Sequence, residues 1–226
     1  QQIAGRMQRA VMTLPRGAAC FLAALFALMR GLRLPWQQRR TTRAVRADFR
    51  AVAELLRLNL GRGFYAFDHM ERAPEVYTDA SKEARFAGGG YVSMCGRYSF
   101  WRYGGSAARQ PIDALEGDAV VVAVRAVGPL AQGKILPMHI DNRSFQLSAV
   151  KGWSKAERLM GQLKELFELA VKYELMYEFH WISTHDNELA DPLSRQDGEK
   201  LFLRRVYERW PELVERGLQR HTTAGH

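Results

Sequence analysis

Beyond residue 74 the sequence alternates short β-favouring runs with amphipathic segments, and acidic residues stand at the ends of the runs. The run at 76–78 leads directly into Asp79, and an apolar run at 134–140 leads into Asp141. Strands that alternate with helices predict an α/β fold in which helices flank a mixed sheet. Residues just beyond the ends of such strands gather in one crevice, so the two acids are expected to lie close together.

The remaining elements of this region follow from hydrophobic periodicity. Residues 87–103 predict a β-hairpin that turns near Cys95 and Gly96, and residues 176–183 predict another strand. Helices with an apolar stripe are predicted at 111–127, 157–171 and 199–214.

The first third of the chain is predicted to be helical. Apolar residues recur at helical spacing in 18–32 and in 45–60, and Gly61 and Gly63 are expected to close the second helix. Pro74 marks the predicted boundary between this helical segment and the α/β region. The chain is therefore predicted to comprise a helical segment at 1–73, an α/β domain at 74–218 and a flexible tail at 219–226.

The positive charge is concentrated in this helical segment. Residues 1–70 contain twelve arginines, no lysine and three acidic residues, which accounts for the whole formal net charge of +9. The planar guanidinium group suits phosphate oxygens, so a polyanion is the expected partner; a solvated basic helix is the alternative. The densest basic cluster is the candidate nucleic-acid-binding site: Arg39, Arg40, Arg43 and Arg46.

Cysteine usage and hydropathy indicate neither a disulfide-bonded protein nor a membrane protein. Cys20 and Cys95 are too few for a disulfide framework or a zinc ligand set, and both are expected in the core of a protein from a reducing compartment. The longest apolar run, at 18–29, has 12 residues, whereas a membrane span needs about 20. An intracellular location, in cytoplasm or nucleus, is expected. The start at Gln1 suggests a fragment or a processed piece of a longer chain.

Four acidic residues are candidates for one shared site. An acid considered singly is more often a surface group or a helix cap, so only the four acids as a set indicate a shared site. Two ionised acids a few ångströms apart repel each other unless a proton or a cation intervenes, and magnesium suits oxygen ligands and substrate phosphates. Glu116, within the apolar stripe of a predicted helix, would join Asp79 and Asp141, and Asp191 in "NELADPLSR" would be the fourth.

Two further acids lie on the same predicted helix as Glu116. Asp118 would point about 200° away from Glu116 and is expected to be solvated. Asp113, roughly one turn earlier, stays an alternative.

The ordered motifs "YTDAS", "LEGDAV", "HIDN", "FHWIST" and "NELADPLSR" resemble a ribonuclease H domain of the retroelement type. The last motif resembles the version found after retrotransposon reverse transcriptases, and "LPRGAACFLAALFALMRGL" resembles the segment that joins such a polymerase to its ribonuclease H. The resemblance covers most of residues 1–196. It implies an endonuclease that cleaves the RNA strand of RNA–DNA hybrids with two magnesium ions, for which manganese can substitute.

The same resemblance implies the setting of the chain and the roles of its acids. Residues 1–73 would be a connection or thumb-like segment, and the partners would be the missing fingers and palm domains of a polyprotein. Asp79 would bridge both ions and Glu116 would reach in from the first helix. Asp141 would hold the ion that activates water, and Asp191 would complete the second site, giving 5′-phosphate and 3′-hydroxyl ends.

His185 is the candidate for a loop histidine that assists product release in cellular members of the family. It lies only six residues before Asp191, a shorter loop than theirs, so a plain loop histidine is the alternative. His139 and His180 are expected to be sheet positions rather than ligands. The glycines at 88–90 match no phosphate-binding spacing and are expected to allow close packing or a bulge.

Other candidates for nucleic-acid contact lie near the acids. Asn142 directly follows Asp141, and Lys151 and Lys155 flank Trp153 where the family has a substrate-contacting segment. The hairpin aromatics can form either a stacking platform or cross-strand pairs: Tyr98, Phe100, Trp101 and Tyr103.

Two other function classes remain open from the sequence. Degenerate ribonuclease H copies act as connectors or nucleic-acid clamps without catalysis. A related nuclease fold that acts on DNA is the other alternative.

Overall fold

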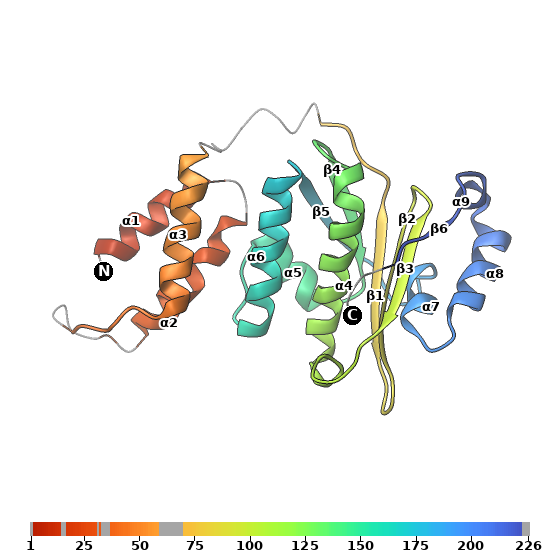
Figure 1. Cartoon of the computed structure of the whole chain (residues 1–226), viewed down its shortest axis with the longest axis horizontal. Helices are drawn as coiled ribbons and strands as arrows, with labels where there is room; N and C mark the ends of the chain where they lie inside the picture. Colours follow the sequence, from red (N-terminus) through yellow and green to blue (C-terminus); the bar gives the residue numbers. More distant parts are fainter. Residues whose placement is uncertain (1, 15–16, 31, 33–36, 59–69, 223–226) are drawn as a thin grey trace.

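The computed structural model describes residues 2–14, 17–30, 32, 37–58 and 70–222. Its centre is a mixed sheet in the order β5-β4-β1-β2-β3-β6 (Figure 1). The strands are β1 (Val76–Lys82), β2 (Ala87–Ser93), β3 (Arg97–Arg102), β4 (Ile135–Ile140), β5 (Met176–Trp181) and β6 (Gln219–Arg220). The predicted α/β class, with a mixed sheet flanked by helices, is confirmed.

Strand β1 organises the sheet because it pairs on both sides. It is antiparallel to β2 and parallel to β4. The ladder with β4 ends at the pair Thr78–Ile140, whereas the ladder with β2 continues to Lys82. The sequence predicted that the strand ends in Asp79. Instead, Asp79 lies within β1 and pairs with β2, but it stands just past the last pair with β4.

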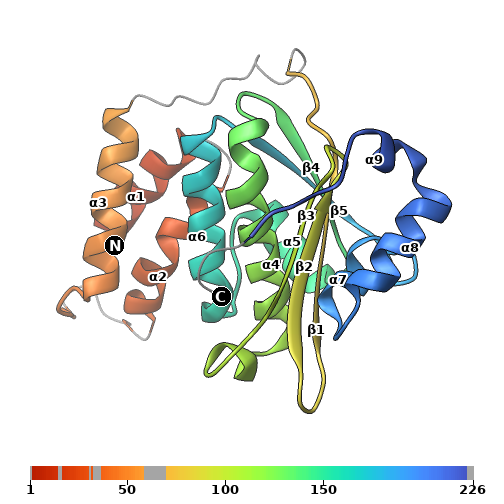
Figure 2. The same ribbon diagram turned by 45° about the vertical axis from the view of Figure 1, so that its right-hand side comes forward.

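Helices cover both faces of the sheet (Figures 1 and 2). On one face α4 (Ile112–Val127) contacts β1 and β2, and α6 (Glu157–Lys172) packs on α4, with α5 (Arg143–Lys151) beside them. The valine-rich α4 is buried on nearly all sides because it lies between the sheet and α6. On the other face lie α7 (Ala190–Ser194), α8 (Glu199–Arg209) and α9 (Pro211–Glu215).

The N-terminal helices pack on α6 and form a second core there. They are α1 (Gln2–Met12), the 3-10 turn η1 (Ala18–Leu22), α2 (Ala23–Met29) and α3 (Arg43–Arg57). Met160, Leu163 and Phe167 of α6 belong to the same hydrophobic cluster as Val45 and Val52 of α3. The domain limits at residues 73 and 218 stay a prediction.

Three predicted elements need correction. The apolar segment at 18–32 is a 3-10 turn followed by the short helix α2, and it is not wholly buried, since Phe26 is 40% exposed. The helix predicted at 199–214 breaks at Trp210, because Pro211 lacks an amide hydrogen and restricts the residue before it. Gln219 and Arg220, predicted to be flexible, form β6 beside β3.

The second predicted helix of the N-terminal segment, at 45–60, begins slightly earlier. Thr42 caps α3 by accepting a hydrogen bond from the amide of Val45. Gly61 and Gly63, and part of the proline-marked loop at 33–36, lie outside the described residues. No helix in the described part of the chain combines the length and apolar character needed to cross a membrane.

Candidate metal centre

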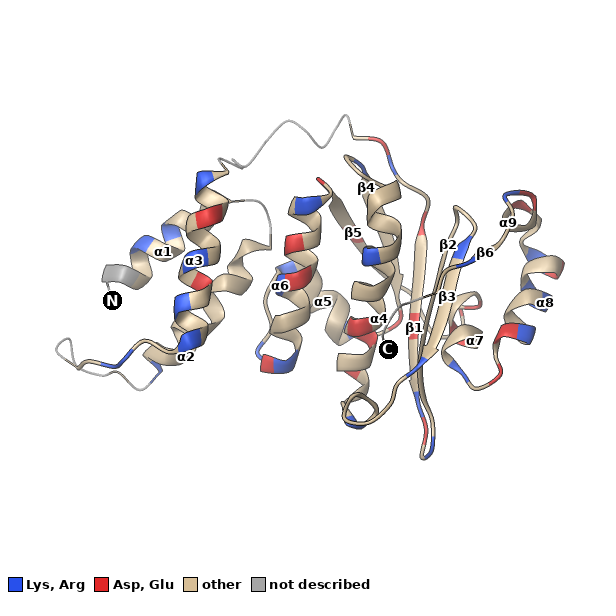
Figure 3. Cartoon of the chain, viewed as in Figure 1, with Lys and Arg blue, Asp and Glu red and all other residues tan. Residues whose placement is uncertain are grey.

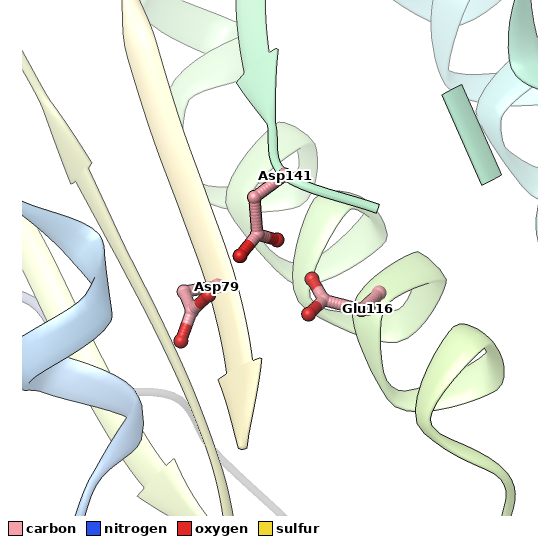
Figure 4. Close-up of side chains that lie close together, drawn as sticks. All are labelled: Asp79, Glu116 and Asp141. Carbon is pink, nitrogen blue, oxygen red and sulfur yellow. The ribbon is translucent and has the colours of Figure 1, made fainter. Parts of the chain in front are cut away.

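Three carboxylates converge where the β1–β4 ladder ends (Figure 4). Asp79 comes from β1, Glu116 from α4, and Asp141 directly follows β4. Each offers an oxygen within 4.8 Å of those of the other two. The strand register explains the convergence, because Thr78 pairs with Ile140 and the next residues of both strands are the two aspartates.

Two members of the cluster are buried, and burial shifts their protonation. Asp79 and Glu116 are each only 3% exposed. Burial, followed by the charge of Asp141, raises the pKa of Asp79 to about 8, although the nearby Ser194 hydroxyl opposes the shift. Burial and the charges of Asp79 and Asp141 also raise the pKa of Glu116 well above its ordinary value. The three groups therefore hold negative charge at a cost unless a cation neutralises it.

The atoms of the cluster suit a hard divalent cation. Oε2 of Glu116 and Oδ1 of Asp141 are buried without a hydrogen-bond partner among the described residues. All three residues offer carboxylate oxygens, the ligand type that magnesium and manganese prefer, and the cluster contains no cysteine or histidine. The residues therefore fit a divalent metal ion.

The fourth predicted acid lies beside the cluster rather than within it. Asp191, in the first turn of α7, lines one groove of about 720 Å³ together with the three clustered acids. Its Oδ1 accepts hydrogen bonds of 3.0 and 2.5 Å from Nε and Nη2 of Arg195. The structure thus brings three of the four predicted acids together and places the fourth in the wall of the groove.

The two neighbouring acids of α4 point elsewhere. Asp113 accepts two hydrogen bonds from Arg158 of α6, which removes it as an alternative to Glu116. Asp118 was expected to be solvated, but it is only partly exposed and accepts a hydrogen bond of 3.0 Å from the hydroxyl of Tyr103.

Two glycines let α7 approach the sheet closely enough to reach the groove. A Cβ on Gly90 would lie 2.5 Å from the Cβ of Leu193, and a Cβ on Gly88 would collide with the carbonyl oxygen of Ser194. That carbonyl accepts a hydrogen bond of 2.5 Å from Ser81 of β1. The glycines thus serve close packing, one of the two roles expected from the sequence, and the signal for it was the run "GGG".

The end of β5 and the loop between β5 and α7 contribute contacts that the sequence did not reveal. Thr184 Oγ1 donates a hydrogen bond of 3.1 Å to Oδ2 of Asp141, and the indole of Trp181 donates one of 2.9 Å to the Asp141 carbonyl. The side-chain amide of buried Asn187 donates to the carbonyl of Thr78 at 3.0 Å. These residues lie within the quoted motifs, but only the folded chain shows that Thr184 and Trp181 bind Asp141 and that Asn187 binds the backbone of β1.

The other predicted site residues lie at the surface. His185 is exposed in the loop before α7, and Lys151 and Lys155 are exposed at and after the end of α5. Asn142 caps α5 by accepting a hydrogen bond of 3.0 Å from the amide of Phe145. The exposed basic cluster, Arg39, Arg40, Arg43 and Arg46, lies at α3 and just before it (Figure 3). Helices α6 and α4 lie between α3 and β1 (Figures 1 and 2).

The hairpin aromatics are mostly core residues. Tyr98, Trp101 and Tyr103 are buried and Phe100 is half-buried, which is incompatible with an open stacking platform. His139 and His180 are sheet positions, as expected, and their rings stack with centroids 5.2 Å apart.

Fold and site together define a mixed α/β protein with a largely buried carboxylate centre where its β1–β4 ladder ends. No protein-family model matches the chain, and no curated protein is detectably similar to it. Among solved structures it is similar to RNase H1 from the archaeon Halobacterium salinarum, with 18% identity and a TM-score of 0.46 over 54% of this chain and 93% of that one.

Two other similar structures are also RNase H domains. The N-terminal RNase H domain of a Mycobacterium tuberculosis protein has 14% identity and a TM-score of 0.44, covering 58% of this chain and 98% of that one. LC11-RNase H1 from compost, in complex with an RNA/DNA hybrid, has 16% identity and a TM-score of 0.42, covering 54% and 93%. All three TM-scores lie below 0.5, and all three identities are low.

Proposed function

We propose that this protein is a ribonuclease H that hydrolyses the RNA strand of RNA–DNA hybrids with the help of divalent cations. The observation that carries the proposal is the convergence of Asp79 within β1, Glu116 of α4 and Asp141 directly after β4. Their order along the chain matches the carboxylate order of the family that the motifs resemble. The groove in front of them is open to solvent and is lined by Lys82 as well as by the acids.

Magnesium, with manganese as a substitute, is the proposed cofactor. Asp79, Glu116 and Asp141 would hold it, and Asp191 would complete a second position. When bound, the two ions would stabilise the attacking and leaving oxygens of an in-line displacement at phosphorus. Thr184 and Trp181 orient Asp141 through its carboxylate and its carbonyl. The nearby Ser194 hydroxyl lowers the pKa of Asp79 and so favours its charged form.

The substrate proposal rests on the motif resemblance and on the distribution of charge. A hybrid would be recognised by its backbone and its 2′-hydroxyls rather than by its base edges. Asn142, which follows Asp141 of the groove, is a proposed contact, and so are Lys151 and Lys155 at and after the end of α5. The basic cluster at α3 is a proposed second contact for the phosphates of a long hybrid, since α6 and α4 lie between it and the acids. His185 is a proposed aid to product release.

The biological setting is proposed from the motifs alone. The chain would be part of a retroelement polyprotein, with residues 1–73 as the connection to polymerase fingers and palm domains. The shared core between α3 and α6 supports a fixed position of this segment relative to the sheet.

A cleavage assay with an end-labelled RNA–DNA hybrid tests the proposed activity. We expect RNA-strand cleavage with magnesium and none with a chelator, and less cleavage of duplex DNA or duplex RNA. Calorimetry with magnesium separates the rival class, because metal binding without turnover would favour a clamp. Preferred cleavage of duplex DNA would favour the other alternative, a related nuclease that acts on DNA.

A further inference from the structure

Arg195 lines the groove beside the acidic cluster and holds the carboxylate of Asp191. Both of its hydrogen bonds, from Nε and Nη2, go to the same oxygen, Oδ1. Asp191 lies in the first turn of α7 and Arg195 at its C-cap, so one helical turn sets their spacing. The pair is therefore built into the wall of the groove that contains the candidate metal centre.

The ion pair of Arg195 involves Asp191, the predicted acid that is not part of the carboxylate cluster. Asp79, Glu116 and Asp141 form the set whose oxygens lie within 4.8 Å of one another, and Asp191 is not in that set. Arg195 carries a permanent positive charge and donates two N–H groups to one carboxylate oxygen, Oδ1. A cation and Arg195 would therefore compete for Asp191, because each neutralises the same negative charge.

Arg195 also has the properties of a phosphate ligand. Its side chain is 48% exposed, so it can turn into the groove without unpacking a core. A guanidinium group binds phosphate oxygens in the same two-point manner as it binds a carboxylate. A nucleic-acid backbone in the groove would thus offer Arg195 an alternative partner.

We propose that Arg195 exchanges Asp191 for a backbone phosphate when nucleic acid binds, and that this exchange releases Asp191 to the metal centre. This inference rests on the proposed function, since it needs both a cation at the cluster and a nucleic acid in the groove. Substrate binding would then complete the cation site, and Arg195 would be a positioning residue that acts on the cation through Asp191.

Magnesium calorimetry without nucleic acid tests the exchange by a readout other than cleavage. The proteins to compare are the wild type, Arg195→Gln and the control Arg158→Gln. Arg158 is a close match, because it is 45% exposed and makes a two-point pair with Asp113 outside the groove. We expect Arg195→Gln to bind magnesium about tenfold more tightly, or to bind an additional ion, because one charge-assisted pair no longer competes. The control should match the wild type.

A second measurement follows hybrid binding in a chelator, where no cleavage occurs. Arg195→Gln should bind the hybrid more weakly, and the slope of log affinity against log salt should fall by about 0.7–0.9, the value of one phosphate contact. Arg195→Lys should retain most of that slope because it keeps the charge. The lysine variant also guards against a folding defect in the glutamine variant.

Each result has one meaning. Equal or weaker magnesium binding in Arg195→Gln overturns the exchange, since Arg195 would then orient Asp191 for the cation instead of withholding it. An unchanged salt slope for hybrid binding overturns it as well. If the wild type cleaves hybrids with magnesium while either result holds, the proposed function stands and only the exchange fails. If the wild type neither binds magnesium nor cleaves hybrids with it, both fail.

Discussion

Gly90 of β2 and Leu193 of α7 approach each other so closely that a methyl group on the glycine would lie 2.5 Å from the leucine Cβ. The contact determines how near α7 lies to the sheet. Because Asp191 and Ser194 are both on α7, the absence of a side chain on Gly90 controls the geometry of the groove. Gly90 thus positions Asp191 and Ser194, although it has no functional side chain itself.

Gly90→Ala should therefore reduce both stability and activity. Over-packing of this contact is expected to cost about 1–3 kcal/mol of unfolding free energy, and the shift of α7 should lower hybrid cleavage. Denaturant unfolding and a cleavage assay measure the two effects. Gly161→Ala on α6 is the control, because a Cβ there would meet no described atom within 4 Å and alanine favours helix by up to about 1 kcal/mol. Wild-type behaviour of Gly90→Ala would contradict this role of the contact.

Asp79→Asn should raise the stability of the metal-free protein and lower its cleavage activity. The neutral amide removes a buried charge, so without metal the variant should unfold at a higher temperature than the wild type at pH 8.5. At pH 5 the two should be nearly equal, because Asp79 is then protonated. Magnesium-dependent cleavage should fall by more than about a hundredfold, as expected for loss of a metal ligand. A variant that cleaves at the wild-type rate would exclude Asp79 from the centre.

The stability of the wild type without metal should fall as the pH rises. The pKa of Asp79 is raised from 3.8 to about 8 in the folded protein, so the folded state keeps a proton that the unfolded state releases. This contribution is fully present below about pH 4 and is lost as the pH passes through about 8. Glu116 acts in the same direction.

Thermal unfolding in a chelator at several pH values between 5 and 8.5 measures this effect. We expect the midpoint to fall by roughly 5–10 °C across that range, at about 2–4 °C per kcal/mol for a chain of this length. Saturating magnesium should reduce or reverse the trend, because the cation stabilises the ionised carboxylates. A midpoint that rises with pH in the chelator would show that the carboxylates are not coupled as described.

The buried ion pair between Asp48 of α3 and Lys164 of α6 should hold the N-terminal helices on the rest of the chain. Asp48→Ala should cost about 1–3 kcal/mol, less than for a fully buried pair because the Lys164 side chain is 25% exposed. Replacing both residues with leucine should recover most of that loss. Glu54→Ala is the control, since its pair with Arg57 is exposed.

Limited proteolysis gives a second readout of this interface. Asp48→Ala should expose α3 to cleavage before the sheet is attacked, and the double leucine variant should be protected. Equal protection of Asp48→Ala and the wild type would mean that the apolar cluster alone holds the helices.

Much of the fold could be predicted because hydrophobic periodicity is local. The strand and helix patterns from residue 75 onward predicted β1 to β5, α4 and α6 close to their observed bounds. Long-range contacts were not predictable in this way. The pairing of β6 with β3, and the packing of α3 on α6, depend on the three-dimensional arrangement of segments that lie far apart in the sequence.

The same distinction between local patterns and long-range contacts applies to the site. Asp79, Glu116 and Asp141 could be proposed as a set because strand ends and helix faces follow from short patterns. The ion pair of Asp191 with Arg195, and the hydrogen bond from Thr184 to Asp141, could not, because both depend on side-chain orientations in the folded chain.

Anomalous diffraction from a crystal soaked in manganese tests the carboxylate centre most directly, because it locates the cation without relying on activity. A peak between the carboxylates of Asp79, Glu116 and Asp141, absent from an Asp79→Asn crystal, is the predicted result. A well-diffracting crystal with manganese bound elsewhere, or none at these three residues, would contradict the account.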